Sequence, residues 1–357
     1  MRNYQFFFAL VVKKIAVSYN LEVPEGFLCG FLRPKKLEIK MNEIKTSFKG
    51  VFLLLLTAFI WGTSFIAQSE SIGKVEPFTF NCVRTLIGGL FLLPVILLKG
   101  RFFRERGQDF NAGTCGIKKH LFYGILLGVV LCIATNFQQF AFEQPEHSAG
   151  KIAFITAMYL FMVPVFGIFF KKKVSVFIWL SIAAGFTGLY FLCIDSRGLG
   201  SLTKGDFLAF LGSVFFAVHI VLIALWAPGL DGIKLSCIQF FVSGLLSGIG
   251  MALFEKPCIA DIFSAGLPIL YAGVLSCGVA YTLQIVGQQY CEETVASLIM
   301  CMESVFAALS EAFCSAVFGM GGKVLSGREV FGCAIMFCAI VCAQIFQARE
   351  GRKKAAC

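Results

Sequence analysis

The sequence predicts an all-α membrane protein in which ten transmembrane helices form two inverted five-helix repeats. Three observations predict this fold class. First, 58% of the residues are hydrophobic, only 15% are charged, 41 are phenylalanine, and the mean hydropathy is +0.82. Second, long apolar segments recur along the chain, and third, the two halves of the chain resemble each other. This composition excludes a soluble globule, because it leaves too few polar side chains to cover one.

Each predicted helix is a segment of about 20 apolar residues, which at 1.5 Å per residue crosses a hydrocarbon layer of ~30 Å. The segments are continuously apolar rather than alternating, which favours helices over a transmembrane barrel. The connections between them are short, so no soluble domain is expected. In order along the chain, the predicted segments are 48–69, 77–98, 121–142, 148–170, 174–194, 205–226, 234–254, 266–288, 294–318 and 327–347.

The formal net charge of +10 comes from basic residues that gather in alternate connections, such as Lys171, Lys172 and Lys173. By the positive-inside rule, this distribution predicts a multi-pass protein of the cell membrane with both termini in the cytoplasm. Basic residues placed at membrane surfaces do not indicate a nucleic-acid partner. The lipid bilayer is the expected environment.

The two ends of the chain are predicted to be cytoplasmic, with an extension at 1–47 and a basic tail at 348–357. The extension has a short apolar run followed by Lys13 and Lys14 without a cleavage site, so a signal peptide is not expected. Met41 opens a compact lead-in to the first helix, and we expect it to be the natural start. The 15 cysteines form no C-x-x-C pair and are interpreted as packing residues. No metal site and no cofactor is expected.

An internal repeat divides the chain into a first unit at 48–194 and a second at 205–347. The segment that begins at Lys49 and Gly50 aligns with the segment that begins at Lys204 and Gly205. Because each unit holds an odd number of helices, the second must insert upside down relative to the first. Inverted repeats are typical of secondary transporters, which move around a site at the repeat interface.

Four segments, 58–68, 77–90, 147–167 and 294–309, resemble the EamA-type permeases of the drug/metabolite transporter superfamily. The resemblance covers residues from about 48 to 347. It implies a ten-helix inner-membrane carrier, often an exporter of amino acids or other small metabolites, driven by an ion gradient. The Glu-Pro dipeptide typical of that family reads Glu303-Ser304 here, so the proline is absent as a source of a kink.

Ionisable residues inside apolar spans are costly, so each is a functional candidate. Glu303 is a candidate carrier of the coupling proton, with a structural role or a pairing with Arg84 as the alternatives. Arg84 is expected either to line a cavity or pair with a carboxylate, or else to reach the outer surface. His219 is equally consistent with proton transfer and with simple packing. Lys151 either reaches water or, at a helix N-terminus, attracts an anionic group of the substrate.

Other polar and aromatic residues of the spans are candidates for lining the substrate cavity. Two G-x-x-x-G patterns, 124–128 and 244–248, predict close helix packing rather than a ligand site. The first to fourth helices of each half are expected to line the cavity, and the fifth and tenth helices to lie outside it. Gln139 and Gln284 stand out among these candidates, because both fall in the third helix of their repeat. The additional cavity candidates are Trp61, Asn81, Asn136, Gln138, Gln139, Tyr159, Gln284 and Gln288.

The functional prediction is a secondary active transporter that exports small metabolites, such as amino acids, by alternating access. Its coupling source is expected to be an ion gradient, with protons the preferred ion, and its substrate to carry an anionic group. A receptor or scaffold without transport activity and a lipid-linked sugar flippase are the alternatives. An enzyme is not expected, although G-T-S-F at 62–65 together with His219 gives a weak signal for an intramembrane protease. The chain could act as a monomer or a homodimer.

Overall fold

The computed structural model describes residues 47–105, 116–144, 149–169, 174–193, 203–318 and 326–356. These ranges all belong to one unit of the chain, 44–357. The predicted N-terminal extension and the expected start at Met41 lie outside the described residues. Within these ranges the regular secondary structure is entirely helical. The prediction of an all-α protein is confirmed for this part of the chain.

The helices of the first half begin with residues that suit a helix start. Ser47 caps the first helix through a hydrogen bond of 3.2 Å from the Gly50 N–H to its hydroxyl oxygen. The next helix begins at Pro77, where a missing N–H group costs nothing. The helices are α3 (Phe48–Ser71), α4 (Pro77–Glu105), α5 (Ile117–Phe142), α6 (Ala149–Thr156), α7 (Tyr159–Phe169) and α8 (Val176–Cys193).

The helices of the second half show the same logic. Thr203 and Asp206 form a capping box at the first of them, and Asp231 caps the second. The elements are α9 (Lys204–Trp226), α10 (Gly232–Phe254), α11 (Ile259–Ser264), α12 (Gly266–Tyr271), the π-helix η1 (Ala272–Tyr281), α13 (Thr282–Gln288), α14 (Glu293–Met300), α15 (Met302–Phe318) and α16 (Gly327–Ala356).

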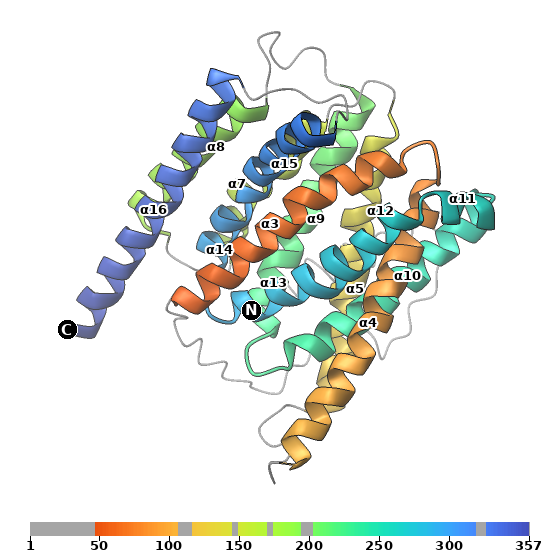
Figure 1. Ribbon diagram of the computed structural model, residues 1–357. Helices are drawn as coiled ribbons and strands as arrows, with labels where there is room; N and C mark the ends of the chain where they lie inside the picture. The colour runs from red at the N-terminus through yellow and green to blue at the C-terminus, as the bar shows by residue number, and fades with distance from the viewer. Residues whose placement is uncertain are drawn as a thin grey trace, which may run out of the picture. The chain divides into compact units, whose positions relative to one another are not determined.

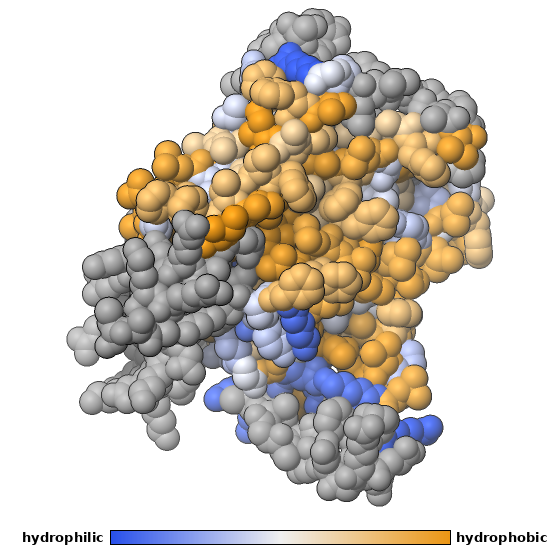
Figure 2. Space-filling view, turned by 60° about the vertical axis from the view of Figure 1, so that its left-hand side comes forward, coloured by the Kyte–Doolittle hydropathy of each residue, from blue (hydrophilic) through white to orange (hydrophobic). Residues whose placement is uncertain are grey.

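Seven helical segments in the described ranges are long and apolar enough to cross a membrane. Three shorter apolar helices, at Ile152–Ile168, Val176–Phe191 and Val330–Ala343, fall on the other predicted spans. The chain is therefore a multi-pass membrane protein. Figure 2 shows why lipid suits it, because one face is mainly apolar, with hydrophilic residues gathered toward its lower edge.

Two predicted spans are interrupted. The span predicted at 148–170 divides between α6 and α7, where Met158 N–H bonds to the Ile155 carbonyl and Leu160 N–H to the Ala157 carbonyl in tight i to i−3 turns. The span predicted at 294–318 divides at Cys301, where the Ser304 N–H bonds to the Cys301 carbonyl. Proline stands at neither interruption, and Pro164 lies inside α7.

A third departure concerns the span predicted at 266–288, whose central ten residues form the π-helix η1. A π-helix is rare, and π-helical turns inside α-helices frequently occur at functional sites. In addition, α11 forms a short helix before this span, in a region predicted as a connection. The apolar pattern predicted the span and its place, but not the wider turns inside it.

The helices pack in pairs drawn from both halves of the chain. In Figure 1, α8 lies along α16 and α4 lies along α10. In addition, α3 packs on α15, η1 and α13, and α9 packs on α5, α6 and α7. A third set of contacts joins α10 to α5 and η1 to α4. Helices far apart in sequence are thus neighbours, which places the interior polar residues between the two halves.

Glycines mark the closest of these helix contacts. A Cβ atom on Gly124 would lie 2.6 Å from Ile238 Cγ2, and one on Gly244 would lie 2.7 Å from Leu86 Cδ2. Both distances are too short for any side chain, so the packing interpretation of the two G-x-x-x-G patterns is confirmed. Gly62 plays the same part in α3, because a Cβ atom there would lie 2.7 Å from the carbonyl oxygen of Glu303.

Candidate functional site

A small cavity of about 40 Å³ lies among helices of both halves of the chain. Its lining comes from α3, α4, α5, α6, α7 and α9, together with η1, α13 and α15. The helices expected to lie outside the cavity, α8 and α16, do not contribute to this lining, and neither does α10, which was expected to line it. The lining residues are Trp61, Ser64, Phe65, Gln68, Arg84, Gln138, Thr156, Tyr159, Phe216, Ile220, Ser276, Tyr281, Gln284 and Glu303.

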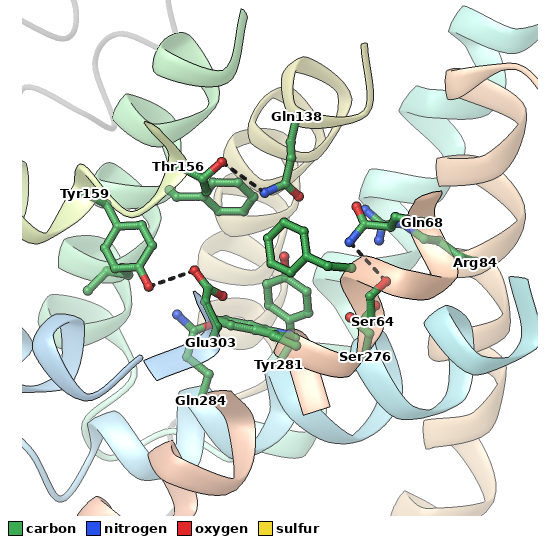
Figure 3. A pocket seen from close by; sticks show the side chains of 14 residues that line it. Ser64, Gln68, Arg84, Gln138, Thr156, Tyr159, Ser276, Tyr281, Gln284 and Glu303 are labelled. Atoms are coloured by element: carbon green, nitrogen blue, oxygen red, sulfur yellow. Dashed lines mark hydrogen bonds between the residues drawn. The ribbon is translucent and has the colours of Figure 1, made fainter. Parts of the chain in front are cut away.

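Glu303 and Tyr159 meet in this cavity, directly after the two helix interruptions. The Tyr159 hydroxyl donates a hydrogen bond of 3.0 Å to Glu303 Oε1, and both side chains are buried (Figure 3). The interruptions themselves also touch, since the Cys301 thiol donates to the Ala157 carbonyl at 3.8 Å. Each half of the chain therefore contributes one interrupted helix and one polar side chain to the same point.

Aromatic rings form the middle of the cavity. The rings of Trp61 and Tyr281 lie 4.6 Å apart between centroids, and Phe65 and Phe216 complete the apolar part of the wall. In Figure 3, Tyr281 lies between Glu303 and Arg84. The cavity therefore has a carboxyl group and a guanidinium group on opposite sides of an aromatic centre.

Arg84 is 2% exposed and does not reach a surface. Its Nε donates a hydrogen bond of 2.8 Å to Asn81 Oδ1, and its guanidinium lies 5.1 Å from the centre of the Phe80 ring. Within the described part of the chain it forms no ion pair, so the pairing with Glu303 is not present and Glu303 bonds to Tyr159 instead. Arg84 was predicted to line a cavity, to pair with a carboxylate or to reach the outer surface, and the structure places it in the cavity lining.

Four buried polar atoms of the cavity lining have no hydrogen-bond partner. They are Trp61 Nε1, Ser64 Oγ, Gln68 Oε1 and Gln284 Oε1. Buried polar groups are nearly always paired in proteins, because an unpaired one loses its bond to water without replacement. A gathering of unpaired donors and acceptors in one cavity is therefore suited to hydrogen bonding with a bound molecule.

Several predicted site residues lie outside the cavity lining. Asn81 and Asn136 stand behind Arg84, where their side chains bond to each other at 3.0 Å. His219 is 1% exposed and hydrogen-bonded to Gln239 at 3.1 Å, with its ring against Tyr281, as a packing residue would be. Gln139 is buried outside the lining. Lys151 lies in α6, but its side chain is outside the described residues.

Sequence reasoning missed a polar stripe on α3. Trp61, Ser64, Phe65 and Gln68 all line the cavity, and their spacing of three, four and seven residues places them on one helix face. Only Trp61 was predicted. The spacing itself was the available signal, since Ser64 and Gln68 are the polar members of an otherwise apolar stretch.

The described residues contain no group of three or more His, Cys, Asp or Glu side chains that could hold a metal ion. Polar groups buried between membrane-spanning helices of two halves, around a common cavity, define the class of a membrane transporter.

The chain belongs to the EamA-like transporter family. The family model matches it twice, at residues 48–194 and 203–345. An uncharacterized transporter from Archaeoglobus fulgidus is 26% identical over 81% of this chain and 83% of its own length. Another from Clostridium kluyveri is 23% identical over 65% of this chain and 75% of its own. The chain is therefore a membrane transporter by family.

Solved structures share the fold. One crystal structure, described only as that of a protein, has a TM-score of 0.65 and 17% identity, and the likeness covers 84% of this chain and 98% of that chain. At this identity the likeness shows the fold alone. It supports the helical arrangement described above and carries no information on substrate.

Proposed function

We propose that the protein is a secondary active carrier that exports small metabolites, such as amino acids, by alternating access. Two five-helix halves, 48–194 and 205–347, would rock against each other around the cavity. The observation that carries the proposal is that both halves supply polar groups to one buried cavity, with Glu303 and Tyr159 meeting where one helix of each half is interrupted.

The helix contacts support the two-repeat arrangement. Exchanging the halves turns the contact of α3 with α15 into that of α9 with α6 and α7, and the contact of α3 with η1 and α13 into that of α9 with α5. The pairs α4 with α10 and α8 with α16 exchange into themselves. Such self-exchanging pairs are expected for ten helices arranged as two inverted repeats.

Glu303 is the proposed carrier of the coupling proton. It is 5% exposed, and Tyr159 supplies its hydrogen bond. A carboxylate so placed is costly without a compensating charge, whereas a protonated carboxyl group is not. Loading and release of a proton would therefore change the stability of the conformation in which the two interrupted helices meet at Glu303. In this way proton binding could drive a conformational change.

The test begins with an efflux screen. Cells that overproduce the protein are assayed for amino acids and other small metabolites in the medium, against cells that produce Arg84→Ala. Export of one class, lost in the variant, supports a carrier. A receptor or scaffold would leave export unchanged, and a flippase would move lipid-linked sugars instead.

The second step uses proteoliposomes loaded with the exported metabolite. Glu303→Gln removes the titratable group while keeping its shape, so we expect it to abolish transport driven by a proton gradient and to retain exchange. Tyr159→Phe, which removes the donor to Glu303 but no charge, should slow both modes to a lesser degree. Gradient-driven transport at the wild-type rate in Glu303→Gln would remove Glu303 from the coupling role.

The proposed location is the cell membrane with both termini in the cytoplasm. The support is the gathering of basic residues in alternate connections. Cys258 offers a test, since it is exposed between α10 and α11 on the predicted outer side. We expect an impermeant thiol reagent applied to intact cells to label it, and Cys258→Ser to lose that label.

A further inference from the structure

We propose that Arg84 is the binding site for an anionic group of the carboxylate class on the transported substrate, and that Asn81 is the positioning residue that leaves the charge of Arg84 available to it. The proposal rests on the proposed function for the identity of the ligand as a transported substrate. The binding site itself is argued from charge, burial and hydrogen bonds.

The charge of Arg84 has no counterion within the described residues. The guanidinium is 2% exposed and forms no ion pair there, and its hydrogen bond goes to a neutral amide oxygen. Arginine stays protonated in proteins and carries five N–H donors, of which the Nε–H alone is used here. The remaining donors belong to a residue that lines the cavity. A bound anion would supply the missing charge.

A chain of hydrogen bonds fixes which end of the Asn81 amide faces Arg84. Asn81 Nδ2 donates to the Thr135 carbonyl at 3.2 Å and to Asn136 Oδ1 at 3.0 Å. Asn136 Nδ2 in turn donates to Ser247 Oγ at 2.9 Å. Turning the Asn81 amide around would set its NH₂ group against the guanidinium, donor against donor. The chain therefore runs in one direction, from α4 through α5 to α10, and keeps the Asn81 oxygen on Arg84.

Hydroxyl and amide groups complete the Arg84 side of the cavity. Figure 3 shows Gln68 beside Arg84, with Ser64 and Ser276 close to each other below them. The Ser64 hydroxyl has no partner, so it is free to donate. Glu303 lies beyond Tyr281 and would repel an anion from its own side of the cavity whenever it has released its proton. The charge of Arg84 therefore draws the anionic group to its side in either state of Glu303, with the apolar part of the substrate against Trp61 and Tyr281.

Binding of benzoate tests the proposal directly, because benzoate joins a carboxylate to a ring that suits the aromatic wall. Trp61 lines the cavity, and Trp179→Phe with Trp226→Phe would leave it as the single tryptophan of the chain. In this background, in detergent, we expect benzoate to change the Trp61 fluorescence with saturation, and neutral benzamide to bind at least about tenfold more weakly. Equal binding of the two probes would overturn the proposal without any change to Arg84.

Two charge variants sharpen the result. Asn81→Asp places a carboxylate on Arg84 itself and should weaken benzoate binding by at least about tenfold, as should Arg84→Gln. The matched control is Gln139→Glu, which adds the same charge to a buried residue outside the lining and should stay within about twofold of wild type. Gel filtration and thermal unfolding check that each variant folds. Wild-type benzoate affinity in folded Asn81→Asp would also overturn the proposal.

The binding assay separates this proposal from the carrier function. Arg84-dependent benzoate binding together with no export in the efflux screen would leave the anion site standing and remove the carrier. Export and proton coupling through Glu303, together with no preference for benzoate over benzamide, would leave the carrier standing and remove the anion site.

Discussion

The two ends of the α4 and α10 helix pair are closed by different chemistry. At the end where α4 begins, Glu255 reaches across from the end of α10 and accepts three hydrogen bonds of 2.7 Å, from the Phe78 and Thr79 N–H groups and the Thr79 hydroxyl. Glu76, just before α4, accepts a further bond of 3.1 Å from the Lys256 N–H. This end is held by carboxylates on backbone groups at a helix N-terminus, where negative charge is stabilised.

The opposite end, where α10 begins, is held by side chains. Lys99 Nζ lies 2.8 Å from Asp231 Oδ2, and the Asp231 N–H donates to His120 Nε2 at 3.0 Å. Asp231 also caps its own helix through the Ile233 N–H at 3.0 Å. This ion pair joins the start of α10 to α4, and the lysine side chain in it is 34% exposed.

The difference indicates which end is easier to open. Backbone groups at a helix start cannot turn away, whereas the partly exposed Lys99 can rotate into water while the buried Asp231 keeps the N–H groups of its own helix start as partners. If the protein works by alternating access, the Lys99 and Asp231 end should separate under milder conditions than the Glu255 end. The proposed orientation places that easier end on the cytoplasmic side.

The largest expected effect is that of Glu255→Ala. It removes all three bonds to the start of α4, so we expect a loss of roughly 2 kcal/mol or more in the free energy of unfolding. The measurement is thermal unfolding in detergent, with Glu255→Gln as the control that keeps one acceptor oxygen. A change smaller than that of Asp231→Ala would contradict the ranking of the two ends.

Asp231 should give an intermediate effect that divides into two parts. Asp231→Ala loses both the helix cap and the ion pair, at a cost of about 1–2 kcal/mol, while Asp231→Asn can keep the cap and loses the pair alone. The same unfolding assay compares them, with Lys99→Met as the matched loss of the pair from the other partner. Asp231→Asn and Lys99→Met should lower the free energy of unfolding by similar amounts. If Asp231→Asn lowered it as much as Asp231→Ala does, the stability would come from the ion pair and not from the helix cap.

Acid should act on the Asp231 end by a smaller amount. Burial would by itself raise the pKa of Asp231, but the hydrogen bond and charge of Lys99 and the N–H groups of Lys234 and Ile233 hold it below its usual 3.8. A lowered pKa in the folded state stabilises the protein above the usual value, and this stability is lost as the pH falls through the folded pKa. Below about pH 4, wild type should therefore lose more stability than Asp231→Asn. Parallel pH profiles of the two proteins would contradict this.

The helical fold and its buried charges could be predicted from the sequence, because lipid leaves the backbone few alternatives and makes each ionisable residue conspicuous. Glu303 and Arg84 were found in this way. Their partners were not, since the order of helices across the bundle decides that Glu303 meets Tyr159. No proline marks Ala157 or Cys301, so the two interruptions had no signal in the chain.

The cavity lining shows a finer limit of prediction from sequence, namely which of two adjacent residues faces the cavity. Gln138 and Gln139 were both candidates and Gln139 was preferred, yet Gln138 lines the cavity and Gln139 does not. Adjacent residues on a helix point about 100° apart. A helix that is apolar all round gives no hint of its own rotation, so the choice between neighbours had to come from packing. On α3, by contrast, the spacing of Ser64 and Gln68 marked the inward face, and this face could have been predicted.

Gly62 couples sequence change in the first half of the chain to sequence change in the second. Any side chain at this position would press on the backbone of Glu303 and on Phe306, in a helix encoded some 240 residues later. The two repeats cannot diverge independently here, because a change in the first copy shifts the carboxyl group of the second. We expect exchange of either half for that of a relative to succeed only when position 62 and the residues around Glu303 travel together.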